Sequence, residues 1–249
     1  MLAASAGGCD ATPVGGHGSD GGATLAHVTV RGRVVDAESC SEPVSGCQPV
    51  RGVVVAAAGA TALRSAPTGA DGAFRLDGLP RGFASDLLLV PQDTAGARYA
   101  PTLNPQIVPA DSDVAEIFGA ELYVLPRDAG SLLDAVRTEA GLDLVTSGGY
   151  VGQAVLETGR VPVDGASAIV YPAQQPVRYV NVLPRMAPTE SALRPATATT
   201  TGPFGIFVFA ASGPREDLAV VPVKDAVAFT LISTRLQPGE VTFAVHFGR

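Results

Sequence analysis

The fold is decided by the stretch Pro49–Gly82, which reads PVRGVVVAAAGATALRSAPTGADGAFRLDGLPRG. It contains a short apolar run, Val53–Ala56, and a later segment, Phe74–Leu76, in which apolar and charged side chains alternate. Just before the second segment stands Asp71-Gly72, a dipeptide typical of tight turns because glycine adopts the positive φ that such turns need. The stretch therefore predicts two β-strands connected by turn residues.

Segments with the same character flank this stretch. Val28–Asp36 alternates apolar and polar side chains, which indicates a half-buried strand. Leu87–Val90 is wholly apolar and predicts a buried strand, and Glu116–Leu125 predicts another. Gly59–Ala70 is expected to be a loop or an irregular edge. Tyr99–Pro109 contains three prolines and is expected to be an extended, edge-like loop.

One segment has helical periodicity. Leu132, Leu133, Val136 and Ala140 fall on one stripe of a helix within Ser131–Gly141. The serine can cap the start, with an acidic residue in the capping-box position, and the glycine can end the helix. We expect this helix to pack between two β units; a partner-binding helix is the alternative.

The β pattern then resumes and partly repeats the first half. Pro49-Val50-Arg51-Gly52 has a counterpart about 115 residues later in Pro162-Val163-Asp164-Gly165, which indicates two tandem domains. Pro184–Thr201 is rich in Pro, Thr and Ala and is expected to be a long surface excursion. Strands are predicted at 150–157, 168–171, 177–183, 204–209, 218–223, 227–233 and 241–247.

Composition agrees with this organisation. The 249 residues are 46% hydrophobic and 16% charged, which is enough apolar surface for a core. The 29 glycines and 20 prolines favour short strands and frequent turns. A net charge of −7 argues against nucleic acid as a partner, because phosphate binding needs a basic face. No apolar run of roughly 18 residues occurs, so no transmembrane helix is predicted.

Small residues precede Cys9 in the segment AASAGGC. This resembles the end of a bacterial lipoprotein signal, whose cysteine becomes the lipidated first residue of the mature protein, although Ala6 stands where that signal usually has Leu. Met1–Gly8 holds only the end of a hydrophobic region, and the Gly/Ser/Asp-rich Asp10–Thr24 is expected to be a flexible tether. The resemblance implies an exported protein, lipid-anchored through Cys9 in the bacterial cell envelope, at the outer membrane or the periplasmic face. The alternative is a flexible terminus with an incidental cysteine.

Cys40 and Cys47 bracket a polar loop that contains Pro43 and Gly46. Two cysteines seven residues apart on either side of a turn can meet across it, and in an exported protein this predicts a disulfide. A metal pair is the competing interpretation, but two thiols without a nearby third ligand make a poor zinc site. If Cys9 carries lipid, no thiol is left over.

The first half resembles the carboxypeptidase regulatory-like domain, a small transthyretin-like sandwich. Four motifs carry the resemblance: Gly32–Asp36, Pro49–Val53, Thr68–Phe74 and Leu79–Gly82. The second half keeps counterparts of the first two motifs but has Pro203 in place of the aspartate of Asp-Gly. The resemblance implies a mostly β fold of two tandem Ig-like or transthyretin-like β-sandwiches joined by one short helix. The expected division is 1–24 tether, 25–128 first sandwich, 129–147 helical connector and 148–249 second sandwich.

The motif residues shape turns and strands and imply no chemistry. Transthyretin-like hydrolases end in Tyr-Arg-Gly-Ser, whereas this chain ends in His246-Phe247-Gly248-Arg249, so that activity is not implied. No P-loop, dinucleotide fingerprint or metalloprotease motif occurs. The remaining candidates are three histidines expected to be structural or solvated, an aspartate read as a turn residue rather than a calcium ligand, and aromatics that could line a sugar or peptide surface: His17, His27, His246; Asp71; Tyr171, Tyr179, Phe204, Phe207, Phe209. Of the aromatics, Phe207 and Phe209 fall on one face of a strand, which is expected to be core.

Together these observations predict a non-enzymatic cell-envelope lipoprotein whose β-sandwiches act as binding or spacer modules. No catalytic residue, metal or cofactor is expected. The expected partners are the membrane, through lipid on Cys9, and a protein or glycan of the envelope. A carbohydrate- or peptide-binding surface protein is the alternative function, and an enzyme whose site matches no known motif is a third.

Overall fold

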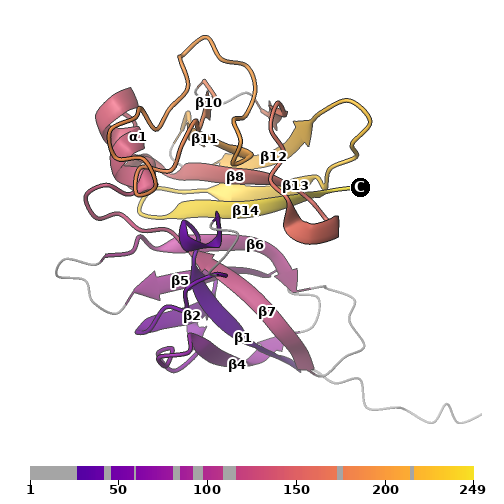
Figure 1. The fold of residues 1–249 in the computed structure, drawn as a ribbon. Coiled ribbons are helices and arrows are strands. Elements are labelled where there is room, and N and C mark those ends of the chain that lie inside the picture. The colour runs from indigo at the N-terminus through magenta and orange to yellow at the C-terminus, as the bar shows by residue number, and fades with distance from the viewer. Residues whose placement is uncertain are drawn as a thin grey trace, which may run out of the picture.

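The computed structural model describes residues 27–41, 46–58, 60–80, 85–91, 98–108, 116–172, 176–213 and 216–249. The predicted lipidation site, Cys9, and the predicted tether lie outside these residues. The described chain is mostly β, with short helices between two groups of strands (Figure 1). None of its helices is both long and apolar enough to cross a membrane.

The first group of strands forms the N-terminal sandwich. One sheet has the order β4-β1-β7, with β1 antiparallel to β4 and parallel to β7. Strands β3, β2, β5 and β6 form the opposing layer. Alternate side chains of the two layers, such as Val30, Leu76 and Leu89, fill the core between them. The strand bounds are β1 His27–Asp36, β2 Val53–Ala57, β3 Ala60–Arg64, β4 Ala73–Pro80, β5 Ser85–Pro91, β6 Thr102–Val108 and β7 Glu116–Val124.

The second group of strands forms the C-terminal sandwich. The sheet β13-β12-β9 packs on the layer β10-β11-β8-β14, and Tyr150, Phe207 and Phe209 lie in the core between them. The helical segments are α1 Leu132–Ala140, α2 Leu144–Ser147 and the 3₁₀ turns Ser39–Ser41 and Thr158–Arg160. The strands are β8 Gly149–Leu156, β9 Ser167–Tyr171, β10 Arg178–Tyr179, β11 Ile206–Ala210, β12 Glu216–Val223, β13 Ile232–Leu236 and β14 Val241–Gly248. The prediction of two β-sandwiches with a short helix between them is thus confirmed.

The two sandwiches share one continuous sheet of eight strands, in the order β10-β11-β8-β14-β6-β5-β2-β3. The shared point is a short parallel pairing in which Val241 and Thr242 of β14 face Thr102 and Leu103 of β6. The sequence pattern did not predict this connection. It means that the relative orientation of the sandwiches is fixed by backbone hydrogen bonds and not only by a linker.

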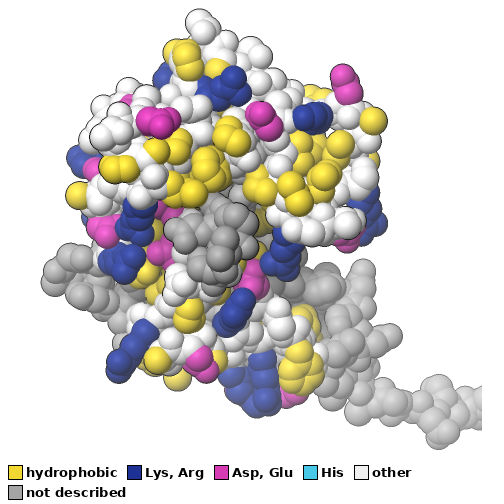
Figure 2. All heavy atoms as spheres, viewed as in Figure 1, with side chains coloured by type: hydrophobic (Ala, Val, Ile, Leu, Met, Phe, Trp, Pro, Cys, Tyr) yellow, Lys and Arg dark blue, Asp and Glu magenta, His cyan; other side chains and the backbone are white. Residues whose placement is uncertain are grey.

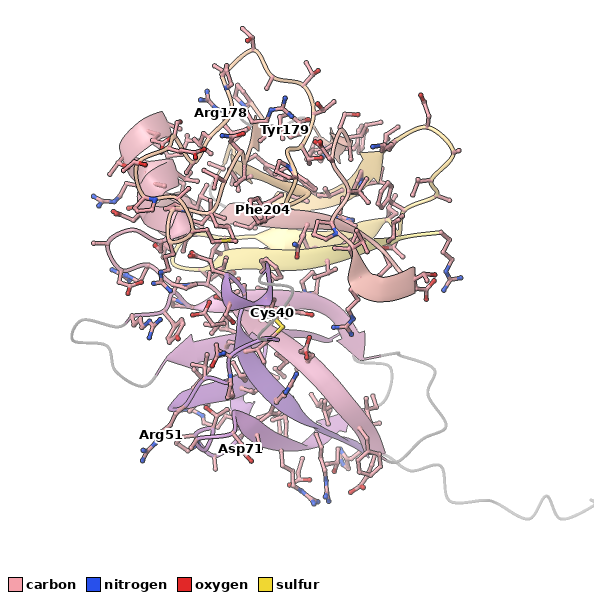
Figure 3. The ribbon with its side chains drawn as sticks, viewed as in Figure 1. Cys40, Arg51, Asp71, Arg178, Tyr179 and Phe204 are labelled. Atoms are coloured by element: carbon pink, nitrogen blue, oxygen red, sulfur yellow. A yellow bond between two sulfur atoms is a disulfide. The ribbon has the colours of Figure 1, made fainter. Side chains whose placement is uncertain are left out.

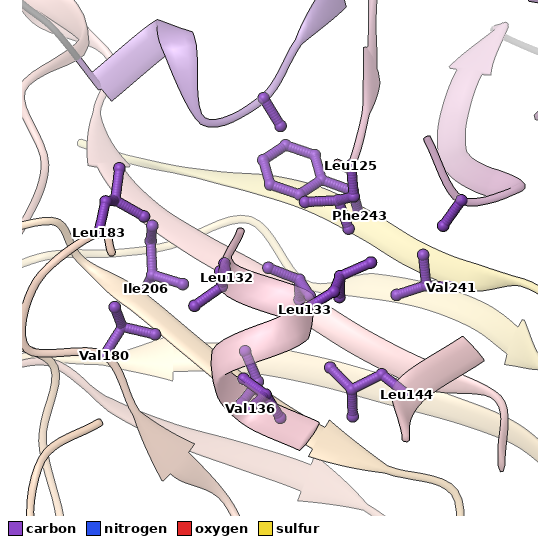
Figure 4. Packing of buried hydrophobic residues seen from close by; sticks show 14 of the residues in the cluster. Leu125, Leu132, Leu133, Val136, Leu144, Val180, Leu183, Ile206, Val241 and Phe243 are labelled. Atoms are coloured by element: carbon purple, nitrogen blue, oxygen red, sulfur yellow. The ribbon is translucent and has the colours of Figure 1, made fainter. Parts of the chain in front are cut away.

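Helix α1 has the predicted bounds and caps. The Ser131 hydroxyl accepts a hydrogen bond from the Asp134 N–H (3.2 Å), and Gly141 ends the helix at φ 69°. The Asp134 carboxylate accepts from the Gly130 N–H (3.1 Å) instead of completing the capping box. The apolar stripe packs on the face of β8 and β14 that lies opposite β9, β12 and β13, as Figure 4 shows for Leu132 and its neighbours. The stripe is therefore core and not a free partner-binding surface.

The segments Tyr99–Pro109 and 177–183 differ from the sequence-based expectation. Tyr99–Pro109, expected to be an edge-like loop, contains β6, which lies inside the shared sheet. This is possible because Pro105 lies beyond the two residues that pair with β14, so its missing N–H costs no hydrogen bond there. Ala60–Arg64 forms the edge strand β3, which pairs irregularly with β2 and so agrees with the expected irregular edge. Of the predicted strand 177–183, only Arg178–Tyr179 is a strand.

The predicted strand 227–233 is also displaced. Strand β13 begins at Ile232 and buries Ile232, Thr234 and Leu236, which leaves Leu231 exposed. The preceding residues pair instead with the end of β14, through the Phe229–Gly248 bridge. The excursion 184–201 contains no strand or helix, and its Ala192 and Leu193 N–H groups donate to the Glu139 carboxylate of α1 (2.9 and 3.1 Å).

Gly32 provides a test of the packing of β1 on β7. The register between these strands shifts opposite Gly32, and a Cβ added there would lie 1.8 Å from the Ala120 carbonyl oxygen. We expect Gly32→Ala to lower the free energy of unfolding by about 2 kcal/mol or more, because two backbones must separate. Gly69→Ala is the matched control, since its Cβ meets only the flexible end of Asp71, and should change stability by less than about 0.5 kcal/mol. Urea unfolding of both variants measures this, and equal effects would contradict the packing described.

Candidate functional site

The predicted disulfide is present. The Cys40 and Cys47 sulfur atoms are bonded at 2.20 Å, so these thiols do not form the alternative metal pair. Figure 3 shows the bond close to the place where the two sandwiches meet. It closes the chain directly after Asp36 and Glu38, two buried acidic residues at the end of β1. The disulfide therefore constrains the segment that carries two buried acidic side chains.

These acidic residues belong to a group of five charged side chains that we call the junction cluster: Asp36, Glu38, Arg98, Asp128 and Arg185. Arg185, from the C-terminal sandwich, lies 3.7 Å from the Asp36 carboxylate and 3.8 Å from that of Glu38, and also contacts Asp128. Arg98 lies 3.7 Å from both Asp36 and Asp128. Charges from both sandwiches thus meet and neutralise one another.

Glu38 links this cluster to helix α1. Its Oε1 accepts a hydrogen bond from the Leu132 N–H (2.7 Å), one of the free donors in the first turn of the helix. Its Oε2 has no hydrogen-bond partner among the described residues, although Arg185 lies within ion-pair distance. Burial raises the pKa of Glu38 to about 7; the Leu132 N–H and Arg185 lower it, and Asp36 and Asp128 raise it.

A cleft of about 340 Å³ borders the junction cluster and is also lined by Tyr99 and Met186. The Tyr99 hydroxyl donates to Asp36 (3.3 Å), and burial next to this carboxylate raises the pKa of Tyr99 to about 12. The cleft offers carboxylates and guanidinium groups that are already paired with one another. This arrangement suits a structural contact between the sandwiches better than acid–base chemistry.

A second ionic contact joins the sandwiches. Glu121 on β7 accepts from Arg160 of the C-terminal sandwich (2.9 Å), from Arg33 (2.9 Å) and from the Tyr123 hydroxyl (2.8 Å). Elsewhere, basic and acidic side chains are interspersed on the face shown in Figure 2, without a field of one sign.

The two described histidines, His27 and His246, lie in different sandwiches. His246 is buried in the C-terminal sandwich, with Nε2 2.9 Å from the Tyr150 hydroxyl and Nδ1 2.9 Å from the Thr230 carbonyl oxygen. Burial lowers its pKa to about 4, so it is neutral near pH 7 and fills a structural role. His27 is exposed at the start of β1, and His17 lies outside the described residues. Within the described chain, no group of three or more potential metal ligands occurs.

Asp71 behaves as a turn residue. Its carboxylate accepts from the Ala73 N–H (3.0 Å), and the Gly72 N–H donates to the Gly69 carbonyl (3.1 Å). Figure 3 places Asp71 and Arg51 at the end of the N-terminal sandwich that is remote from the junction. The turn interpretation is therefore the one that the geometry supports.

The candidate aromatic residues do not form one surface. Tyr179, Phe207 and Phe209 are buried, and Phe204 is half-buried. Tyr171 alone among them is highly exposed, at 77%. The Tyr179 hydroxyl accepts from the Ala168 N–H (3.2 Å) and so protects the edge of β9 instead of facing a ligand.

Sequence reasoning missed Glu38 and Arg185. Neither lies in a motif, and their significance depends on contacts between residues about 90 to 150 positions apart. A weak signal was available for Glu38, because an acidic residue between a strand and a disulfide loop is easily brought close to the backbone of another element. No signal in the sequence identified its partner at Leu132.

No family model and no curated protein matches the sequence. Solved structures similar to this chain include shaft pilin SpaA from Lactobacillus rhamnosus GG, with 11% identity, 90% of this chain and 98% of the other covered, and a TM-score of 0.25. The minor pilin GBS52 from Streptococcus agalactiae has 11% identity, coverages of 89% and 95%, and a TM-score of 0.26. The Bacillus anthracis TIE protein has 10% identity, coverages of 89% and 34%, and a TM-score of 0.26. Similarity at this level carries no argument about fold or function.

Two buried groups, Glu38 and His246, make contributions to the free energy of unfolding that change with pH in opposite directions. The folded pKa of Glu38 is raised from 4.5 to about 7, so its contribution to stability is present below pH 4.5 and is lost as the pH rises through 7. The folded pKa of His246 is lowered from 6.5 to about 4, so its contribution is present above pH 6.5 and is lost as the pH falls through 4. Each shift corresponds to roughly 3 kcal/mol.

The amide oxygen of Glu38→Gln can still accept a hydrogen bond from the Leu132 N–H. We therefore expect the free energy of unfolding of this variant to equal that of the wild type near pH 4 and to be roughly 3 kcal/mol higher at pH 8. The profile of the variant should then rise between pH 4 and 6.5, because only His246 still titrates of the two. Urea unfolding at several pH values tests this. A difference between variant and wild type that does not change with pH would contradict the buried position of Glu38.

Proposed function

We propose that this protein is a non-enzymatic, exported module of the bacterial cell envelope that acts as a rigid spacer. The observation that carries the proposal is the fixed junction between the sandwiches. Backbone pairing of β14 with β6, the contacts of Arg185 and Arg160, and the Glu38–Leu132 hydrogen bond all cross it. Such a junction holds the two bodies in one orientation, which a spacer requires and a flexible linker does not provide.

The position of the first described residue supports the anchor. Strand β1 begins at the end of the N-terminal sandwich that points away from the C-terminal sandwich (Figure 1). A lipid on Cys9, followed by the expected tether, would place the N-terminal sandwich next to the membrane and β12 and β13 farther out. The Cys40–Cys47 disulfide agrees with export, because disulfides persist in oxidising compartments.

The proposed family of the N-terminal sandwich rests on its sequence motifs. We infer a carboxypeptidase regulatory-like domain in the N-terminal sandwich, because Gly32 and Gly72 occupy motif positions where a Cβ would meet a backbone oxygen. The carbohydrate-binding alternative has little support, since burial of Tyr179, Phe207 and Phe209 leaves Tyr171 without an aromatic partner among the candidates. A peptide ligand remains the better form of the binding alternative.

Rigidity is tested by distances across the junction. In a Cys9→Ser background, spin labels at Asp71→Cys and Asp225→Cys lie on different sandwiches, and both sites are exposed. We expect one narrow distance distribution in pulsed electron resonance, as narrow as that of the control pair Glu190→Cys and Asp225→Cys within the C-terminal sandwich. A broad distribution for the first pair beside a narrow control would remove the spacer proposal.

The anchor is tested separately in a bacterial host that expresses the protein with its complete native N-terminus. We expect metabolic incorporation of a fatty-acid analogue and recovery in the membrane fraction, both abolished by Cys9→Ser. The control is the double variant Cys40→Ser and Cys47→Ser, which lacks the other two cysteines and should remain labelled. Absence of label from the wild type, or label that persists in Cys9→Ser, would show that Cys9 is not the lipid site.

A further inference from the structure

Among the described residues, strand β14 has a continuous partner on only one side. Along one edge it pairs with β8 from Val241 to Gly248. Along the other edge the described pairings are limited to its two ends. Strand β6 pairs at Val241 and Thr242, and the segment around Phe229 pairs near Gly248, where the Thr230 N–H donates to the Phe247 carbonyl (2.9 Å). The stretch 243–246 lies between these two contacts.

The backbone groups of this stretch alternate between the two edges. The Val241 N–H donates to the Pro101 carbonyl (3.0 Å), and the Phe247 N–H donates to the Thr230 hydroxyl (3.0 Å), both on the side away from β8. The β8 pairing shows no register shift, so Val245 must direct its N–H and carbonyl to the same side. Strand β6, which would continue the ladder there, has already diverged.

A cleft of about 310 Å³ lies along this edge. It is lined by Phe243 and Val245, whose side chains point to one face of the sheet, and also by Ala244 and Ile232, which belong to the core on the opposite face. Residues on both faces of a strand can line one cleft only where the cleft opens at the strand edge. Asn104 on β6 lies on the other side. Figure 1 shows β6 curving away from β14 at this place.

The ends of the cleft are closed by the two contacts that bracket 243–246, so a long strand of another folded domain cannot enter. The charged groups at its rim, Glu121 and Arg160, pair with each other at 2.9 Å and offer no net charge to a ligand. The lining is largely apolar, and the open edge presents peptide groups at strand spacing. These features match a short, extended, neutral peptide segment.

We propose that this slot between β6 and β14 binds an extended, mainly apolar segment, about four residues long, from a loop or terminus of a partner protein, by β-strand addition to β14. The main-chain hydrogen bonds of the segment would complete the shared sheet, and its alternate side chains would contact Phe243 and Phe247. This inference goes beyond the spacer function and is independent of lipid on Cys9, so either can fail without the other.

The probe is the capped peptide acetyl-Val-Thr-Val-Thr-amide, titrated into the isotope-labelled full-length protein. We expect weak but saturable shifts of the amide signals of residues 243–246. The same peptide with methylated backbone nitrogens is the matched control, and it should bind about 30-fold more weakly if two hydrogen bonds are lost. Equal binding of both peptides, no saturable shift, or shifts confined to the exposed face around Tyr171 would overturn the proposal.

Hydrogen exchange of the free protein tests the open edge without a ligand. The Val245 N–H should exchange at least about tenfold faster than those of Ala244 and His246, which point toward β8. Equal protection of the three amides would show that the edge is already occupied and would rule out strand addition. Both experiments use the unmodified chain, so the folding of a variant does not affect the result.

Discussion

The parallel pairing of β14 with β6 is the constraint on which the architecture depends. It involves only Val241 and Thr242, yet it converts two sandwich layers into one eight-stranded sheet. Because these hydrogen bonds fix the direction of both strands, the sandwiches cannot rotate about a linker without breaking them. Helix α1 covers the face of β8 and β14 that lies opposite β9, β12 and β13, and its buried stripe belongs to the same apolar cluster as Val241 and Phe243. The apolar cluster on this face therefore stabilises the same relative orientation of the sandwiches as the hydrogen bonds between β14 and β6.

The ionic contacts between the sandwiches favour one relative orientation of the two. Burying Glu38 is unfavourable by itself, which its raised pKa expresses, but the side chain satisfies a free N–H at the start of α1. Arg185 and Asp128 surround it with charges of both signs. Isolated exposed ion pairs stabilise little, but a network with buried members is lost together if the sandwiches separate. Hence the junction cluster contributes more to the specificity of the orientation than to total stability.

Local elements were predictable because their signals are local. Alternation of side chains located β1 and β8, and Ser131 with Gly141 located both ends of α1. The spacing of Cys40 and Cys47 indicated their bond. The pairing of β6 with β14 joins residues about 140 positions apart, and no local pattern specifies such a register. Pro105 argued against a strand, although it is harmless once β6 has left β14. The Glu38 cap and the position of Arg185 were hidden for the same reason.

The slot and the fixed junction have one physical origin. Strand β6 must pair with β5 over much of its length and with β14 at its start, and neighbouring strands in a sheet twist relative to each other. It cannot follow both partners, and Pro105 lies just after the shared point, where β6 no longer pairs with β14. The pairing with β5 continues and that with β14 ends, which leaves the edge at Val245 without a partner strand among the described residues.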